Sequence, residues 1–147
     1  MDTYTSCAFR LETRRIAETD FPYGGQQLSS VASVQQFCAS LEVIDFEKFI
    51  ALLLNSENKL IGLHIQQGTA NQCATFPREI TKYCLLTGAT GVILVHNHPS
   101  GSITPSPQDK SATQEIKKAL NLFEILLLDH VLISGVTATS ILVSCFS

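Results

Sequence analysis

The hydrophobic positions of the chain follow two periods, one typical of helices and one typical of strands. Val31, Val34 and Cys38 recur at spacings of three and four residues, which predicts a helix with one buried face. The apolar stretches KFIALLLN and KLIGLHIQ are separated by the polar SEN and predict a β-hairpin. The segment FPREITKYCLLTG predicts a second helix, because Pro77 stands near its start and Gly88 just past its end.

The second half of the chain continues this alternation of helices and strands. The β-branched run GVILV, residues 91–95, predicts a strand buried on both faces that leads directly into His96. A helix is predicted over about 107–122, with a buried face formed by Ala112, Ile116, Ala119 and Phe123. Further strands are predicted at residues 4–11, 126–133 and 141–146. The order of elements predicts an α/β fold with a mixed β-sheet flanked by helices.

Length and composition agree with one globular domain over residues 1–147. The chain is 45% hydrophobic and 16% charged, well away from the composition of disordered proteins. A domain of this size buries enough surface to fold without a disulfide or a structural metal. Any metal is therefore expected to serve a reaction rather than to brace the fold.

Charge and cysteine content narrow the possible partners and the compartment. Ten basic and thirteen acidic residues leave a net charge of −3, which gives no support for binding nucleic acid. The five cysteines are odd in number and form no C-x-x-C pair, so reduced thiols are expected. The first residues contain no apolar signal region, and no run of about 18 apolar residues occurs, so we expect a cytoplasmic protein without a membrane partner.

The stretch VHNHPSGSITPSPQD, residues 95–109, contains the candidate chemistry. His96 and His98 stand two residues apart at the end of a predicted strand, so both imidazoles point to the same side. The chain then turns back to a helix that begins at Ser106, with Asp109 in its first turn. Two neutral imidazoles and one carboxylate would leave a fourth tetrahedral position for water, as in catalytic zinc sites.

A simpler interpretation exists for each part of this pattern. Histidines at strand ends often only hydrogen-bond to the backbone, and H-x-H alone is a weak motif. Ser106 and Asp109 match the N-cap and N3 positions of a capping box. Capping explains these two residues without chemistry, but it leaves the two histidines unexplained in an apolar strand end. Metal ligation accounts for both histidines and for Asp109 together.

A metal-bound water also needs a general base, usually a carboxylate that does not itself ligate the metal. Three acidic residues precede the first hairpin strand, namely Glu42, Asp45 and Glu47. The spacing alone does not choose among them.

The pattern His96-x-His98, seven residues, Ser106, two residues, Asp109 resembles the JAMM (MPN+) metalloprotease signature, and HNHPSGSITPSPQD resembles its RadC branch. The segments EKFIALLLNSENKLIG, GTAN, PREI and LLDHVLIS are similar to RadC segments in the same order, over about residues 28–135. The resemblance implies a JAB1/MPN-type fold, a mixed sheet related to that of cytidine deaminases.

The resemblance further implies a zinc-dependent hydrolase of peptide or isopeptide bonds with one zinc per chain. Glu47 matches the general base of the family, and we expect Ser106 to stabilise the oxyanion. Asp129 and His130 match a DH pair of the family, which could support metal ligands or form hydrogen bonds at a strand end.

The resemblance leaves the partners less well defined. RadC proteins usually carry an N-terminal helix-hairpin-helix region, and the opening residues here are too few to supply it. We therefore expect a peptide or protein substrate and no strong nucleic-acid binding by this domain. The alternative is a non-catalytic or vestigial module that acts in DNA repair or mobile-element biology through a partner. Nucleobase deamination is set aside, because the chain lacks H-x-E with P-C-x-x-C. The oligomeric state stays open.

Overall fold

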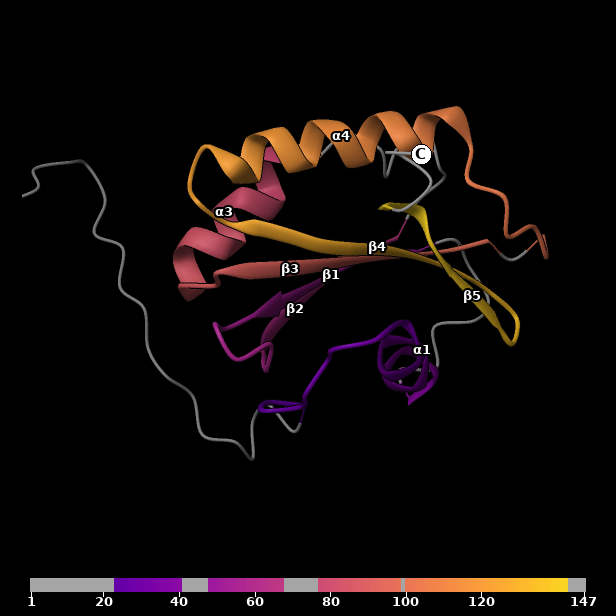
Figure 1. Ribbon diagram of the computed structural model, residues 1–147, viewed down its shortest axis with the longest axis horizontal. Coiled ribbons are helices and arrows are strands. Elements are labelled where there is room, and N and C mark those ends of the chain that lie inside the picture. The colour runs from indigo at the N-terminus through magenta and orange to yellow at the C-terminus, as the bar shows by residue number, and fades with distance from the viewer. Residues whose placement is uncertain (1–22, 41–47, 68–76, 99, 143–147) are drawn as a thin grey trace, which may run out of the picture.

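The computed structural model describes residues 23–40, 48–67, 77–98 and 100–142, which form one mixed α/β fold (Figure 1). In chain order its elements are α1 (Val31–Ser40), β1 (Lys48–Leu54), β2 (Leu60–Gln67), α3 (Pro77–Thr87), β3 (Gly91–Asn97), α4 (Pro107–Asn121), β4 (Leu126–Ser134) and β5 (Thr137–Ser140). The five strands form one sheet in the order β2-β1-β3-β4-β5. β3 and β4 are parallel, and the other neighbouring pairs are antiparallel, so the sheet is mixed as predicted.

Helices cover both faces of the sheet. α3 and α4 lie on one face and α1 lies on the other (Figure 1). Alternate residues of β1, which lies between β2 and β3, pack into the two resulting core layers. The layer under α3 and α4 takes Phe49, Ala51 and Leu53, and the layer under α1 takes Ile50, Leu52 and Leu54. Burial on both faces explains why this strand has a continuous apolar sequence rather than an alternating one.

Strand β3 carries the candidate residues to one end of the sheet. His96 pairs with Phe49 of β1 and with Leu132 of β4. Val92 and Leu94 pack in the layer under α3 and α4, and His96 lies on that same face because side chains alternate along a strand. The carboxyl end of β3 therefore lies next to the first turn of α4.

Most predicted elements are confirmed within the described residues: the helix from Val31, the β-hairpin, the helix from Pro77, the strand from Gly91 and the helix from Pro107. The prediction of the buried face of α4 was partly wrong. Phe123 is 52% exposed, and Leu120 is fully buried in its place. The physical reason is that α4 ends at Asn121, and a left-handed residue, Glu124 with φ 57°, turns the chain immediately afterwards.

The last predicted strand was placed too late in the chain. β5 comprises Thr137–Ser140, because a tight turn at Gly135, with φ 57°, returns the chain directly after β4. Ile141, expected within the strand, is fully buried beyond its end. The strand predicted at residues 4–11 and the end of the other, residues 143–146, lie outside the described residues.

Two cysteines of the described part, Cys38 and Cys84, are buried free thiols. Burial raises the pKa of Cys38 to about 12 and that of Cys84 to about 11, so both stay protonated at neutral pH. No helix among the described residues is long and apolar enough to cross a membrane.

Candidate metal centre

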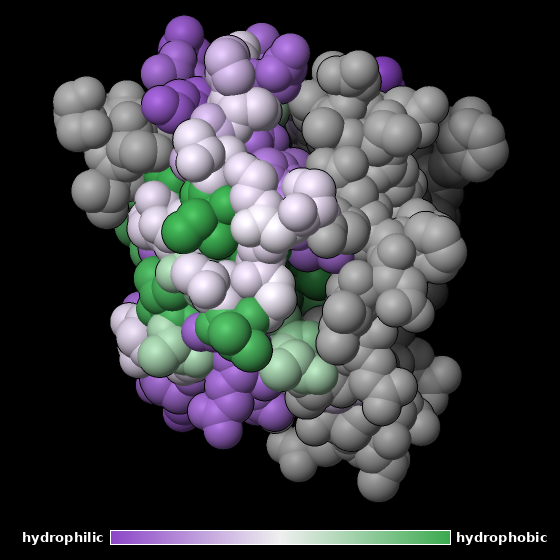
Figure 2. Space-filling view, turned by 90° about the vertical axis from the view of Figure 1, so that its right-hand side faces the viewer, coloured by the Kyte–Doolittle hydropathy of each residue, from purple (hydrophilic) through white to green (hydrophobic). Residues whose placement is uncertain are grey.

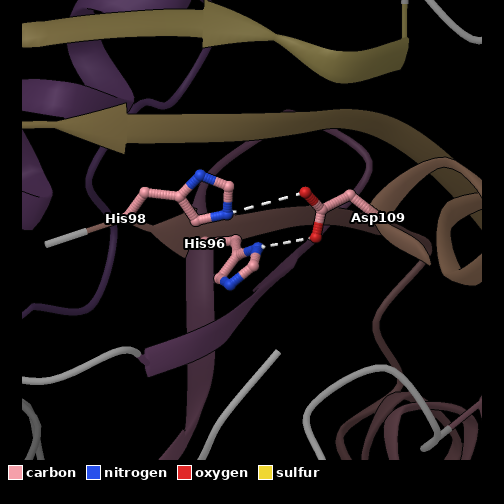
Figure 3. Close-up of side chains that lie close together, drawn as sticks. All are labelled: His96, His98 and Asp109. Carbon is pink, nitrogen blue, oxygen red and sulfur yellow. Dashed lines mark ion pairs between the residues drawn. The ribbon is translucent and has the colours of Figure 1, made fainter. Parts of the chain in front are cut away.

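His96 and His98 lie side by side at the carboxyl end of β3, as their spacing predicts (Figure 3). Their ring centroids are 4.7 Å apart, and the ring planes are nearly perpendicular, at 85°. His96 is 2% exposed, whereas the His98 side chain is 14% exposed. The pair therefore forms one side of a site that is closed toward the core and partly open at His98.

Asp109 reaches the two histidines from the first turn of α4. Ser106 is the N-cap, and its hydroxyl oxygen accepts a hydrogen bond from the Asp109 N–H at 3.0 Å. The Ser106 N–H donates in return to Asp109 Oδ2 at 2.8 Å, which completes a capping box. Pro107 occupies the first helical position, where its missing N–H costs nothing. The cap thus holds the carboxylate in place, so capping and ligation are compatible roles of one residue.

The three side chains converge. His96 Nδ1 lies 3.2 Å from Asp109 Oδ1, and His98 Nε2 lies 3.5 Å from Asp109 Oδ2 (Figure 3). One ligand atom from each residue can be chosen so that all three lie within 4.8 Å of one another. The structure therefore brings together the three residues that the sequence predicts as metal ligands.

The hydrogen bond of His98 tests whether this group suits a metal ion. Its Nδ1 lies 3.2 Å from the carbonyl oxygen of Ser102. Because a carbonyl only accepts, this contact places the proton on Nδ1 and leaves a lone pair on Nε2 in the neutral ring. That lone pair faces the Asp109 carboxylate at 3.5 Å, and two acceptors in this position repel unless a proton or a metal ion lies between them. Ligating histidines typically donate their other ring N–H in this manner, so the residues fit a metal ion.

Asp109 is held in its ionised form. Burial alone would raise the pKa of its carboxyl, but the His96 ring, whose Nδ1 lies 3.2 Å from Oδ1, and the hydrogen bond from the Ser106 N–H outweigh burial and hold the pKa below its usual value. The carboxylate is therefore negative at neutral pH and available to a cation.

Backbone contacts fix the loop that carries the two histidines. The His98 N–H donates to the Ile133 carbonyl, and the Ser134 hydroxyl donates to the His98 carbonyl, both at 2.9 Å. Asn97, between the two histidines, accepts a hydrogen bond on Oδ1 from the Lys48 N–H at 2.5 Å. Lys48 directly follows Glu47 in the chain, but Glu47 itself lies outside the described residues, so its role as general base stays a prediction. The other two candidate bases lie in the same undescribed segment.

The DH pair divides into two different environments. Asp129 accepts hydrogen bonds from the His130 N–H at 2.7 Å and from the Ser140 hydroxyl at 2.5 Å, so it supports the strand pairing of β4 and β5. His130 is fully buried on the face of the sheet that α4 covers. Its Nδ1 lies 2.6 Å from the hydroxyl of Thr113 in α4. Nothing in the spacing of the sequence points to Thr113. The signal for this contact was the Asp129–His130 pair within a largely apolar strand.

Figure 2 shows the end of the molecule at which β3 terminates. Hydrophobic side chains are exposed there between a hydrophilic upper margin and a hydrophilic lower margin. The loop that leads from β3 to α4 and the turn from β4 to β5 lie at this end (Figure 1), and each contains an exposed apolar residue, Ile103 at 42% and Val136 at 93%. The candidate site therefore stands next to a partly apolar surface.

The five-stranded mixed sheet and the convergent His, His and Asp side chains define an α/β domain of the JAB/MPN type with a possible metal site. The model of the RadC-like JAB domain matches residues 28–144, and the chain belongs to this family. The resemblance seen in the sequence is thereby confirmed.

Several relatives carry the name UPF0758 protein. The chain is 43% identical over 107 residues to one from Finegoldia magna, covering 72% of this chain and 47% of that protein. It is 40% identical over 118 residues to one from Thiobacillus denitrificans, covering 79% and 53%. It is 38% identical over 128 residues to one from Cupriavidus pinatubonensis, covering 85% and 55%. The chain thus spans about half the length of the curated relatives it matches.

Proposed function

We propose that this domain is a zinc-dependent hydrolase of peptide or isopeptide bonds, with one zinc ion held by His96, His98 and Asp109. The observation that carries the proposal is the convergence of two imidazoles and one carboxylate within 4.8 Å. Two nitrogen ligands and one oxygen ligand suit catalytic zinc, which keeps a further coordination position open. When bound, zinc would supply a Lewis acid for the scissile carbonyl and a water molecule with a pKa of about 7.

Side chains of this domain would exclude water, admit the substrate, transfer the proton and stabilise the oxyanion. Burial of His96 and Asp109 excludes bulk water from the inner side of the site, and the partial exposure of His98 leaves access for substrate. Glu47, as general base, would take a proton from the attacking water and return it to the leaving amine. Ser106 Oγ accepts from the Asp109 N–H, so its own proton is available for donation to the oxyanion.

A polypeptide is the substrate class that we propose. The exposed apolar residues Ile103 and Val136 lie on segments at the same end as the candidate site, where they can contact an unfolded or extended chain. The match covers only about half of each curated relative. The activity of a whole protein of that length is therefore also a proposal.

The test compares wild type with Glu47→Gln. The variant is expected to retain zinc while hydrolysis falls by roughly 10²–10⁴-fold, the usual contribution of a general base. Cleaved protein termini are compared by mass spectrometry in cells that express either form, and bound zinc is measured on the purified proteins. Glu57→Gln, which changes an exposed acid on the loop between β1 and β2, serves as the matched control.

Three outcomes would contradict part of the assignment. Loss of zinc in Glu47→Gln would make Glu47 a ligand. Unchanged hydrolysis would return the role of base to Glu42 or Asp45. Identical termini with and without active protein, together with retained zinc, would favour the alternative of a non-catalytic module that acts through a DNA-repair or mobile-element partner. Tight, salt-sensitive binding of duplex DNA would favour that alternative further, because the net charge of −3 does not predict it.

A further inference from the structure

A buried polar chain connects α4 to β4 next to the candidate metal centre. Thr113 is 1% exposed and His130 is fully buried. The Thr113 hydroxyl oxygen lies 2.6 Å from the carbonyl oxygen of Asp109 and 2.6 Å from Nδ1 of His130. One hydroxyl group thus joins the backbone of a proposed ligand to a side chain on the neighbouring strand.

The direction of both hydrogen bonds follows from the atoms involved. A carbonyl oxygen only accepts, so the single proton of the Thr113 hydroxyl is donated to Asp109. The hydroxyl oxygen must then accept from His130, which requires the proton on Nδ1. The chain therefore runs from the His130 Nδ1–H to the Thr113 hydroxyl and on to the Asp109 carbonyl.

The place of His130 in the sheet makes this chain a link between the two elements that supply ligands. His130 pairs with Leu94 of β3, two residues before His96. Thr113 follows Asp109 by one helical turn and faces the same side of α4. The polar chain therefore ties the strand that carries the histidines to the helix turn that carries the carboxylate.

Neighbouring rings keep His130 in this position. Its ring packs edge-on against Phe49, with centroids 5.5 Å apart and planes at 75°. The His96 ring is farther away, at 6.4 Å between centroids. His130 is not among the three residues whose ligand atoms converge within 4.8 Å. Its contacts therefore suit a supporting role rather than ligation.

We propose that Thr113 and His130 are positioning residues, which set the height and rotation of the first turn of α4 so that Asp109 meets His96 and His98. This inference rests on the metal site of the proposed function. The apolar residues Ile116 and Leu120 also hold α4 on the sheet. Hydrophobic contact is not directional, however, and tolerates small slides of the helix that a hydrogen-bonded chain does not.

The experiment compares Thr113→Val with Thr113→Ser in the full chain. Valine keeps the size of threonine and removes the hydroxyl, whereas serine keeps the hydroxyl. Zinc affinity is measured by competition with a chelator dye, and stability is measured separately by thermal melting in excess chelator. We expect Thr113→Val to weaken zinc binding roughly 10-fold or more, as the loss of supporting contacts around metal ligands does. We expect Thr113→Ser to bind zinc within about 3-fold of wild type.

Equal zinc affinity in wild type and Thr113→Val would overturn the inference, even if the variant melts at a lower temperature. Equal weakening in both variants would also overturn it, because the hydroxyl would then not be the group that matters. Unequal affinities with rescue by serine would support it.

A second readout needs no metal and separates this inference from the proposed function. In chelator, amide hydrogen exchange of Asp109 and Lys110 reports on the first turn of α4, and exchange of Leu120 reports on the rest of the helix. If wild type binds no zinc, the proposed function fails, and faster exchange confined to the first turn in Thr113→Val still supports positioning. Equal exchange, or a uniform increase along α4, overturns it.

Nitrogen NMR of His130 must also show the Nδ1–H tautomer, and the Nε2–H tautomer would contradict the hydrogen-bond chain.

Discussion

The two ends of α4 are held on the sheet by different forces. At the amino end, the capping box, the buried carboxylate of Asp109 and the Thr113 hydroxyl are joined by hydrogen bonds. At the carboxyl end, Ile116 and Leu120 pack into the core, and the next residues are exposed, Leu122 at 82% and Phe123 at 52%. The amino end therefore depends on a few directed contacts and the carboxyl end on apolar area.

This difference separates the requirements of the candidate site from those of the fold. Burial of apolar area stabilises the helix against the sheet but leaves its exact position adjustable. A group of three ligand atoms requires a defined position, because metal coordination distances vary by only a few tenths of an ångström. Mutations at the two ends are therefore expected to change different measurements.

The largest expected effect is the loss of metal when a ligand is removed. Purified protein is expected to carry close to one zinc per chain, and His96→Ala or His98→Ala should carry almost none. Metal content is measured by elemental analysis after dialysis against metal-free buffer. Full occupancy in both variants would remove the metal site from consideration.

At the other end of α4, Leu120→Ala tests stability without touching the site. Leu120 is fully buried, so truncation should lower the free energy of unfolding by about 2–5 kcal/mol. Zinc affinity of the folded variant should stay near that of wild type. Leu122→Ala, on an exposed neighbour, is the matched control and should change stability by no more than about 0.5 kcal/mol. A large loss of affinity in Leu120→Ala would show that the two ends are not separable.

The amino end should also make the metal-free protein sensitive to acid. Burial, helped by the nearby His96, lowers the pKa of His130 to about 3. Below a pH of about 6.5 the unfolded chain takes up a proton on this residue that the folded chain does not. The free energy of unfolding should therefore fall between pH ~6.5 and ~3, by up to about 1.4 kcal/mol per pH unit.

Denaturant titrations in chelator at several pH values measure this slope. His130→Asn, which can still donate to Thr113 but does not titrate, should show a smaller slope over the same range. Asp109 acts at lower pH, because its pKa is depressed: its contribution is present above its unfolded pKa of about 3.9 and is lost as pH falls through its lower folded pKa. Parallel slopes in wild type and His130→Asn would contradict the assignment to His130.

The smallest expected effect distinguishes the two roles of Asp109. In chelator, Asp109→Asn should cost up to about 2 kcal/mol, the value of a charge at a helix end in a partly buried position. In excess zinc the two proteins should diverge further, because a ligand that binds only the folded state stabilises it by RT ln(1 + [L]/Kd). Melting curves under both conditions give the comparison. An equal difference in chelator and in zinc would leave Asp109 as a cap alone.

The convergence of His96, His98 and Asp109 could be anticipated because it depends on local rules. A period of two places both histidines on one side of a strand end, and the capping box fixes Asp109 in the first turn of the helix. The resemblance to the family supplied the remaining step, since H-x-H by itself does not specify a metal site.

The contact between Thr113 and His130 could not be anticipated from periodicity. The pairing of β4 with β3 shifts by one residue between Val92 and Ile93, so Leu127 and His130 face the same helices although they are three residues apart. A strict alternation along β4 would have placed them on opposite faces. The shift depends on pairing between strands far apart in the chain. The position of β5 was missed for a different reason, because its sequence TATS is polar and its start depends on the turn at Gly135.

The parallel pairing of β3 with β4 also has a consequence for the order in which the chain folds. A parallel pair cannot close through a short turn, so the whole crossover through α4 must be in place before the two strands meet, and such pairings form slowly. Only ten residues separate His98 from Asp109, at the very beginning of that crossover. Closing so short a loop costs little chain entropy. An ion bound by these side chains during folding would therefore fix the start of the crossover relative to β3 before β4 pairs with it.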